Sequence, residues 1–156
     1  MVVRNHIETK KFCHGYLFYG DREKSLGIMD EISSNLLCEE MSGCGKCFFC
    51  GVERQKNPNY YFYNFQKLGI EDSIFLIEES NKKPLRGINK VFHIEIGNLS
   101  RESQNALLKT LEEPAPGNYF LIYVNSFEEI LDTLKSRLAT IFLNPERKKW
   151  SSGWGG

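Results

Sequence analysis

The order of apolar segments in this chain predicts an α/β domain with a parallel sheet covered by helices on both faces. Short, almost continuously apolar runs, typical of buried strands, alternate with stretches whose apolar residues recur every three or four positions, as in an amphipathic helix. The 156 residues suffice for one domain with a core of ordinary size and are too few for two comfortable ones. We therefore expect one domain in residues 1–145 and, in residues 146–156, a tail without periodicity that is flexible or left over from cloning.

The first half of the chain predicts two strands, each followed by a helix. The aromatic run at residues 16–19 ends at Gly20, as a buried strand entering a tight turn does. Residues 24–37 carry apolar side chains at helical spacing. Residues 60–65 are strongly aromatic and predict a second strand, and residues 70–79 predict a short helix.

The second half of the chain continues the alternation. Residues 89–96 are a further candidate for a buried strand. Ser100 is a plausible N-cap for a helix that begins at Arg101, and Pro114 stops that helix. The remaining expected elements are a strand over residues 119–124, a helix over residues 127–134 and a strand over residues 139–143.

Charge and hydropathy exclude several classes of function. The 20 Lys and Arg residues balance the 20 Asp and Glu residues, so no global field draws the chain to nucleic acid or to an anionic membrane. No apolar run approaches the roughly 20 residues of a membrane span, and residues 1–6 lack the apolar core of a secretory signal. We expect a cytoplasmic protein with no membrane partner, and any contact with DNA must be local.

Four cysteines are crowded into residues 38–50, with the spacing C-x5-C-x2-C-x2-C: Cys38, Cys44, Cys47 and Cys50. Four thiolates within so short a loop can surround one tetrahedral zinc ion. The alternative, four buried or reactive free cysteines, finds little core in a loop rich in Gly, Ser, Glu and Lys. We expect a structural zinc module inserted at about residues 38–50, because nothing suggests an open coordination position. Cys13 lies apart and is expected to be a packed residue.

Several segments together resemble the bacterial DNA polymerase III clamp-loader subunits, in particular the delta-prime type, which is related to gamma and tau. They are, in chain order, His14–Phe18, Lys90–Ile94, Leu99–Ser100, Asn105–Pro114 and Ser136–Leu138, the last of which stands where the family carries Ser-Arg-Cys. The resemblance covers roughly residues 10 to 145 and includes the position of the cysteine cluster. It implies a AAA+ nucleotide-binding fold; the family's helical lid and collar domain have no counterpart in this sequence.

The phosphate-binding loop that such a fold implies is degenerate here. A working loop needs the pattern G-x-x-x-x-G-K-[ST], whose backbone amides, lysine and hydroxyl hold the phosphates and magnesium. After Gly20 the second glycine is absent, Lys24 and Ser25 come too early, and Asp21 and Glu23 place negative charge where phosphate would lie. We expect no ATP binding, although a shortened loop formed by Gly20, Lys24 and Ser25 remains the alternative.

The acidic end of the third predicted strand agrees with this expectation. Active relatives carry Asp-Glu there, for magnesium and for the attacking water. This chain keeps only Glu95, which we expect to be an ordinary solvated residue. Asn125 stands at about the position of the family's polar sensor residue after the next strand, where little remains to be sensed.

Two further sites follow from the resemblance. It implies that Arg137 is an arginine finger offered in trans to ATP on a neighbouring subunit, the alternative being an ordinary exposed arginine. It also implies that the start of the helix at Arg101, with Ser103 and Asn105, faces DNA. A helix start can hold a backbone phosphate, although a solvated helix end is the commoner explanation.

Three functions remain open at this stage. The first is a non-hydrolysing clamp-loader subunit that assembles with gamma/tau and delta subunits and acts, through the complex, on a sliding clamp and primer-template DNA. The second is an active ATPase whose shortened loop still works. The third is a free-standing, zinc-stabilised binding module.

Overall fold

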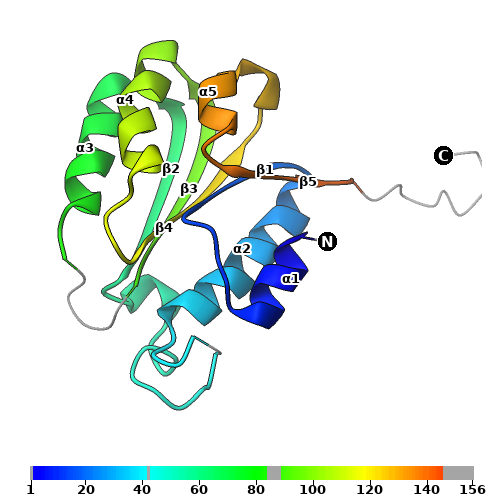
Figure 1. The fold of residues 1–156 in the computed structure, drawn as a ribbon, viewed down its shortest axis with the longest axis vertical. Helices are drawn as coiled ribbons and strands as arrows, with labels where there is room; N and C mark the ends of the chain where they lie inside the picture. The colour runs from blue at the N-terminus through cyan, green and yellow to red at the C-terminus, as the bar shows by residue number, and fades with distance from the viewer. Residues whose placement is uncertain (1, 42, 84–88, 146–156) are drawn as a thin grey trace, which may run out of the picture.

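The computed structural model describes residues 2–41, 43–83 and 89–145, and shows one five-stranded sheet with the strand order β2-β3-β4-β1-β5 (Figure 1). Every neighbouring pair of strands is parallel, so the predicted parallel α/β architecture is confirmed. The strands are β1 (Gly15–Gly20), β2 (Tyr60–Leu68), β3 (Lys90–Leu99), β4 (Asn118–Val124) and β5 (Ala139–Leu143). The helices are α1 (Val2–Thr9), α2 (Arg22–Leu37), α3 (Ile70–Ser80), α4 (Arg101–Glu112) and α5 (Asp132–Lys135), with 3-10 turns η1 (Arg54–Lys56) and η2 (Phe127–Glu129).

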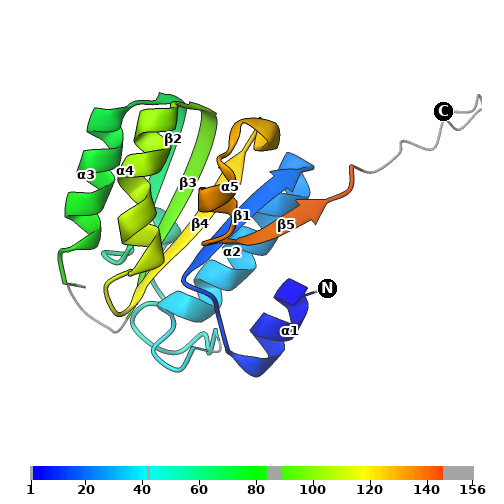
Figure 2. The same cartoon turned by 45° about the horizontal axis from the view of Figure 1, so that its top comes forward.

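Helices cover both faces of the sheet. Helices α3, α4 and α5 lie on one face, and α1 and α2 lie on the other (Figures 1 and 2). Beneath α3 and α4 the aromatic rings of Tyr61, Phe92 and Phe120 stack across three neighbouring strands at centroid distances of 4.9 Å. Beneath α2 the core is built from Tyr16 and Phe18 of β1 against the buried Met29 of the helix. Alternate side chains along a strand therefore pack into two separate cores, one on each face of the sheet.

Helix α1 has no counterpart among the elements expected from the sequence. Its Val3 is almost completely buried in the core beneath α2, where Ile7, one helical turn later, also packs. The ring of His6 lies with Nδ1 2.7 Å from the hydroxyl oxygen of Tyr16. An eight-residue helix with a narrow apolar stripe is a weak signal in isolation, and its packing on β1 supplies the stabilisation.

The prediction of one helix over residues 127–134 is wrong, because this stretch forms the turn η2 and the separate short helix α5. A buried side-chain amide of α4 stabilises the interruption between them. The side-chain nitrogen of Gln104 donates to the Glu129 carbonyl (3.0 Å), and its side-chain oxygen accepts from the Leu131 backbone N–H (2.6 Å). These bonds satisfy backbone groups that a continuous helix would pair internally.

Strand β3 begins with a completely buried lysine. The Lys90 ammonium donates to the carbonyls of Glu79 (2.5 Å) and Lys82 (2.6 Å), at the end of α3. Its Nζ also lies 5.2 Å from the ring centroids of Tyr61 and Phe92. Burial lowers the pKa of Lys90 from its ordinary value, and the nearby Glu79 opposes that shift. The cation thus caps the negative end of the α3 dipole.

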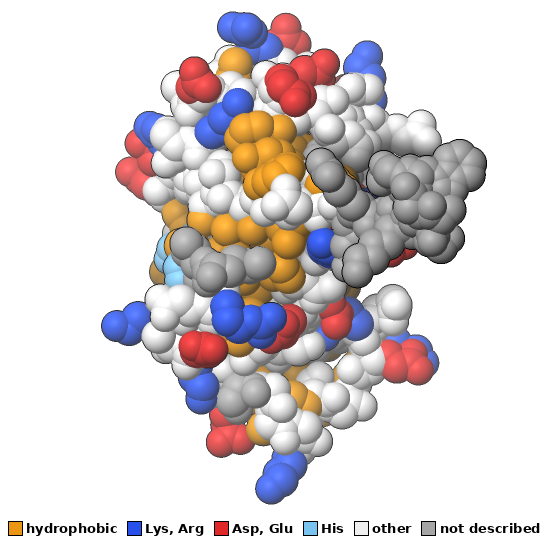
Figure 3. Space-filling view, turned by 90° about the vertical axis from the view of Figure 1, so that its right-hand side faces the viewer, with side chains coloured by type: hydrophobic (Ala, Val, Ile, Leu, Met, Phe, Trp, Pro, Cys, Tyr) orange, Lys and Arg blue, Asp and Glu red, His pale blue; other side chains and the backbone are white. Residues whose placement is uncertain are grey.

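Strands β2 and β5 form the two edges of the sheet in the part of the chain that is described. Figure 3 shows the side that carries β5 and α1, where hydrophobic side chains form a band across the middle. No described helix is both long and apolar enough to cross a membrane. The expected tail at residues 146–156 lies outside the described residues, and the domain boundary at residue 145 stays a prediction.

Candidate functional site

The connection between β1 and α2 is a single residue, Asp21, which caps the helix. Its carboxylate accepts from the Lys24 backbone N–H at 2.9 Å, and its own N–H donates to the Leu143 carbonyl at 2.8 Å. Helix N-termini hold phosphate through free N–H groups and a positive dipole end. Here a carboxylate of the chain already stands at that end.

The three residues expected to form a shortened phosphate loop have local structural roles. Gly20 has φ +100°, and a Cβ there would lie 2.2 Å from the Leu143 carbonyl oxygen, so the turn itself requires glycine. The Lys24 ammonium donates to the Asn144 carbonyl at 2.8 Å. Ser25 is fully buried, and its hydroxyl donates to the Asp21 carbonyl at 2.8 Å. None of the three residues lines the cavity that lies beside Glu95 at the carboxyl ends of β2, β3 and β4.

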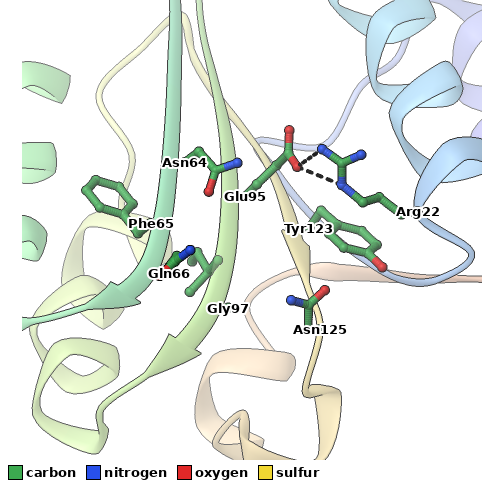
Figure 4. A pocket seen from close by; sticks show the side chains of 9 residues that line it. Arg22, Asn64, Phe65, Gln66, Glu95, Gly97, Tyr123 and Asn125 are labelled. Carbon is green, nitrogen blue, oxygen red and sulfur yellow. Dashed lines mark hydrogen bonds and ion pairs between the residues drawn. The ribbon is translucent and has the colours of Figure 1, made fainter.

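Glu95 is buried, so the expectation of a solvated residue was wrong. The carboxylate accepts two hydrogen bonds from the Arg22 guanidinium, from Nη2 at 2.6 Å and from Nε at 3.1 Å (Figure 4). Its other oxygen lies 3.3 Å from Nε2 of His93. Sequence reasoning missed Arg22 and His93, because the contact with Arg22 spans 73 positions and no local pattern announces it.

His93 continues this buried polar chain into the sheet. Its Nδ1 lies 2.8 Å from the hydroxyl of Tyr60, whose pKa burial raises to about 12. Burial lowers the pKa of His93, and the neighbouring Glu95 carboxylate opposes that shift. At neutral pH the imidazole is therefore uncharged, and Glu95 has one full positive partner, Arg22.

A cavity of about 140 Å³ opens beside this ion pair, at the carboxyl ends of β2, β3 and β4. Figure 4 shows Arg22, Asn64, Tyr123 and Asn125 around Glu95. The Tyr123 hydroxyl donates to the Gly20 carbonyl at 3.0 Å. The exposed Asn125 lines the same cavity as Glu95. The carboxyl ends of the strands are where ligands bind in parallel α/β sheets. The cavity is small and its one buried carboxylate is already neutralised.

The four clustered cysteines meet in space, with all four Sγ atoms within 4.8 Å of one another. A zinc tetrahedron with Zn–S bonds of about 2.3 Å has S···S edges of about 3.8 Å, and Cys44 Sγ and Cys50 Sγ are 3.9 Å apart. Backbone N–H groups point at the sulfurs: Cys44 N–H donates to Cys38 Sγ at 3.3 Å, and Cys47 N–H donates to Cys44 Sγ at 3.4 Å. The donor set and its hydrogen bonds fit one metal ion held by four thiolates.

Arg137 lies between α5 and the start of β5, at the opposite end of the parallel sheet from Glu95. Its guanidinium donates to Ser136 Oγ at 2.9 Å and makes an exposed ion pair with Glu112 at 3.3 Å. The next residue, Leu138, is buried against Gly15, which explains an apolar residue at the position where the family carries cysteine. A cavity of about 490 Å³ opens beside Arg137.

Helix α4 presents only part of the expected nucleic-acid site. Ser103 is fully buried; its hydroxyl donates to the Leu68 carbonyl at 3.0 Å, and its N–H donates to the N-cap Ser100 at 3.1 Å. Arg101 and Asn105 are exposed. The predicted N-cap is confirmed, and the side chain of Ser103 serves the core in this structure.

Comparison with known proteins identifies the family. A family model described as DNA polymerase III, delta subunit, matches residues 1–147. The chain belongs to this family. DNA polymerase III subunit delta' of Escherichia coli is 31% identical over 132 residues, covering 79% of this chain and 40% of the relative. The delta' subunit of Buchnera aphidicola from Schizaphis graminum is 31% identical over 98% of this chain and 49% of its own length.

A solved structure carries the same fold. A DNA polymerase III gamma subunit-related protein of Thermotoga maritima superposes with a TM-score of 0.64 at 16% identity, covering 93% of this chain and 46% of that protein. This likeness confirms the parallel α/β fold that was expected from the sequence. The chain spans less than half the length of these relatives.

Proposed function

We propose that this chain is the AAA+-type domain of a delta-prime-like clamp-loader subunit that does not itself hydrolyse ATP. Relatives named DNA polymerase III subunit delta' support the role. The proposed partners are gamma/tau and delta subunits and, through the assembled complex, a sliding clamp and primer-template DNA. A cytoplasmic location goes with this role.

The capped start of α2 is the observation that carries the proposal. The Asp21 carboxylate already accepts the Lys24 N–H at the position where a phosphate would bind, and one connecting residue is too short to wrap a triphosphate. Like charges within about 4 Å repel strongly away from bulk water. Glu95, the one carboxylate that remains where active relatives carry Asp-Glu, is held by Arg22. Both features argue against the alternative of an active, shortened loop.

Arg137 is proposed to act on a neighbour's nucleotide. Its position at the amino end of β5 directs it away from the degenerate site of its own subunit. The side chain is 35% exposed and its pair with Glu112 is a surface one, worth at most about 1 kcal/mol, so a phosphate group could replace it. A guanidinium suits this role because it stays charged and offers several donors.

Zinc is proposed at Cys38, Cys44, Cys47 and Cys50. When bound, the ion would hold the residues between α2 and η1 together as a structural centre. DNA contact is proposed for Arg101 and Asn105 only, since Ser103 is buried. These exposed side chains at the start of α4 could hold a backbone phosphate.

The decisive experiment measures binding of a fluorescent ATP analogue with magnesium to the zinc-loaded chain, with a gamma-type relative as the positive control. We expect no binding, together with about one zinc per chain by metal analysis. Micromolar binding would overturn the non-hydrolysing proposal and favour an active ATPase. Two or more metals per chain, or none, would contradict the four-thiolate site.

The arginine finger is tested in a reconstituted clamp loader that contains the full subunit. Arg137→Ala should slow ATP hydrolysis at the adjoining site about a thousandfold, as loss of such a finger does elsewhere. Arg4→Ala, on helix α1, which lies on the other face of the sheet from α5, is the matched control and should leave the rate unchanged. Failure of the subunit to assemble with gamma/tau at all would favour the free-standing module.

A further inference from the structure

Strand β2 leaves a long edge of the sheet open. It has nine residues and pairs only with β3 among the described strands. Its first seven residues, Tyr60 to Gln66, carry no charge, and five of them are aromatic. Natural proteins usually protect such an edge with charge, proline or a very short strand, because unpaired N–H and C=O groups are a template for another strand. Strand β5, at the other edge, has only five residues.

The face of β2 towards α3 offers an aromatic shelf beside this edge. Tyr61, Tyr63 and Phe65 share that face and are only partly buried. Phe75 of α3 is 44% exposed and stands edge-on to Tyr63 at a centroid distance of 5.6 Å. Ile74, next to it, is 47% exposed. Side chains of an added strand would pack on this shelf at every second position.

The opposite face of β2 offers a recess. Phe62 is 51% exposed and meets the ring of His93 edge-on at 4.8 Å. A cavity of about 340 Å³ opens beside it, lined by Asp30, Arg54, Gln55, Tyr60 and Phe62. Arg54 is fixed in this wall by an ion pair to Asp30 at 2.8 Å. Aromatic side chains therefore flank the open edge on both faces, which suits the alternating side chains of an extended peptide.

The negative charge of α3 distinguishes between the possible binding partners of the β2 edge. Helix α3 carries four acidic residues and no basic one, and its Glu71 and Glu78 are exposed. Pairing of β2 with a second copy of itself would bring two such helices together, so like charges oppose a homodimer. We propose that the β2 edge is a docking site for an extended segment of another protein, uncharged and alternately apolar at its centre and basic at its ends, which adds to the sheet as a further strand.

The test is selection of random ten-residue peptides, displayed on phage, against the purified full chain. Phe75→Glu and Phe62→Asp disrupt the shelf and the recess; Phe142→Glu on β5, also at a residue that is 50% exposed, is the matched control. Thermal unfolding checks that each variant is folded. Enriched peptides are then synthesised, and their affinities are measured by fluorescence anisotropy with each variant.

Enriched peptides should alternate apolar and polar residues, carry Lys or Arg at the ends and avoid proline at the centre. The affinity for the peptides should weaken at least about tenfold with Phe75→Glu and with Phe62→Asp, and stay unchanged with Phe142→Glu. Bound peptide should also slow amide hydrogen exchange in residues 61–65 of the wild type. Peptides that bind wild type and Phe75→Glu equally, or no enrichment over a parallel selection against Phe75→Glu, would overturn the proposal. So would a wild-type dimer in sedimentation that Phe75→Glu abolishes, since the occupant would then be a second copy.

Discussion

Replacement of Arg22 by methionine should destabilise the fold far more than the same change at Arg4. Both arginines make a close ion pair with a glutamate, at 2.6 Å for Arg22 with Glu95 and at 2.5 Å for Arg4 with Glu31. The glutamates differ in burial, since the Glu95 side chain is 7% exposed and that of Glu31 is 39% exposed. The comparison therefore sets a buried carboxylate, held by two hydrogen bonds from its arginine, against an exposed one held by a single bond at nearly the same distance.

The size of the effect follows from what each substitution leaves behind. Without Arg22 the Glu95 carboxylate remains buried beside an uncharged His93. A charge-assisted hydrogen bond is worth about 1.5–3 kcal/mol, but the Arg22 side chain is 54% exposed and water can enter in its place. We expect a loss of about 2 kcal/mol in the free energy of unfolding, below the 3–5 kcal/mol seen when a fully buried pair is broken. Arg4→Met should cost at most about 0.5 kcal/mol.

Thermal and urea unfolding of the zinc-loaded variants at pH 7 measure this difference. A loss of about 2 kcal/mol corresponds to a fall in melting temperature of about 4–8 °C for a chain of this size. Equal melting temperatures for Arg22→Met and Arg4→Met would refute the reasoning, because the buried carboxylate would then need no partner. Magnesium-dependent binding of an ATP analogue by Arg22→Met, but not by the wild type, would show that the guanidinium blocks a site that is otherwise competent.

Three further outcomes follow from single residues. Burial lowers the pKa of His93, so below about pH 6.5 the unfolded chain binds more protons than the folded chain. The free energy of unfolding should therefore fall from pH 7 to 5.5, and it should fall less steeply in His93→Asn, as measured by urea unfolding. Lys90→Met removes two bonds to the end of α3 and should cost about 2 kcal/mol; an unchanged urea midpoint would contradict this. Gly20→Ala should cost more than about 2 kcal/mol, whereas Gly27→Ala, with open space in the interior of α2, should stabilise by about 0.5–1 kcal/mol; calorimetry compares the two.

Features set by neighbouring residues could be predicted from the sequence. Ser100 was expected to cap α4, and its hydroxyl does accept the Ser103 N–H. The spacing of Cys38, Cys44, Cys47 and Cys50 predicted a site for one zinc ion, and the four sulfurs do lie close together, because a short loop can bring them together without help from distant parts of the chain. The aromatic and β-branched runs predicted the strands, since a strand that is buried on both faces needs apolar residues at every position.

Features that depend on distant residues were decided by the tertiary structure. Glu95 looked like a solvated strand end, but Arg22 reaches it from the first turn of α2 and allows it to be buried. The helix expected over residues 127–134 is divided because Gln104, on another helix, takes its backbone hydrogen bonds.

The sequence by itself determined the alternation of strands and helices, the caps and the cysteine cluster, because each depends on groups within a few residues of one another. Only the tertiary structure decided which strand lies at an open edge, which carboxylate is neutralised and which end of the sheet carries Arg137. The physical reason is that desolvation and ion pairing act through space, and a buried charge is stable only where folding brings its partner.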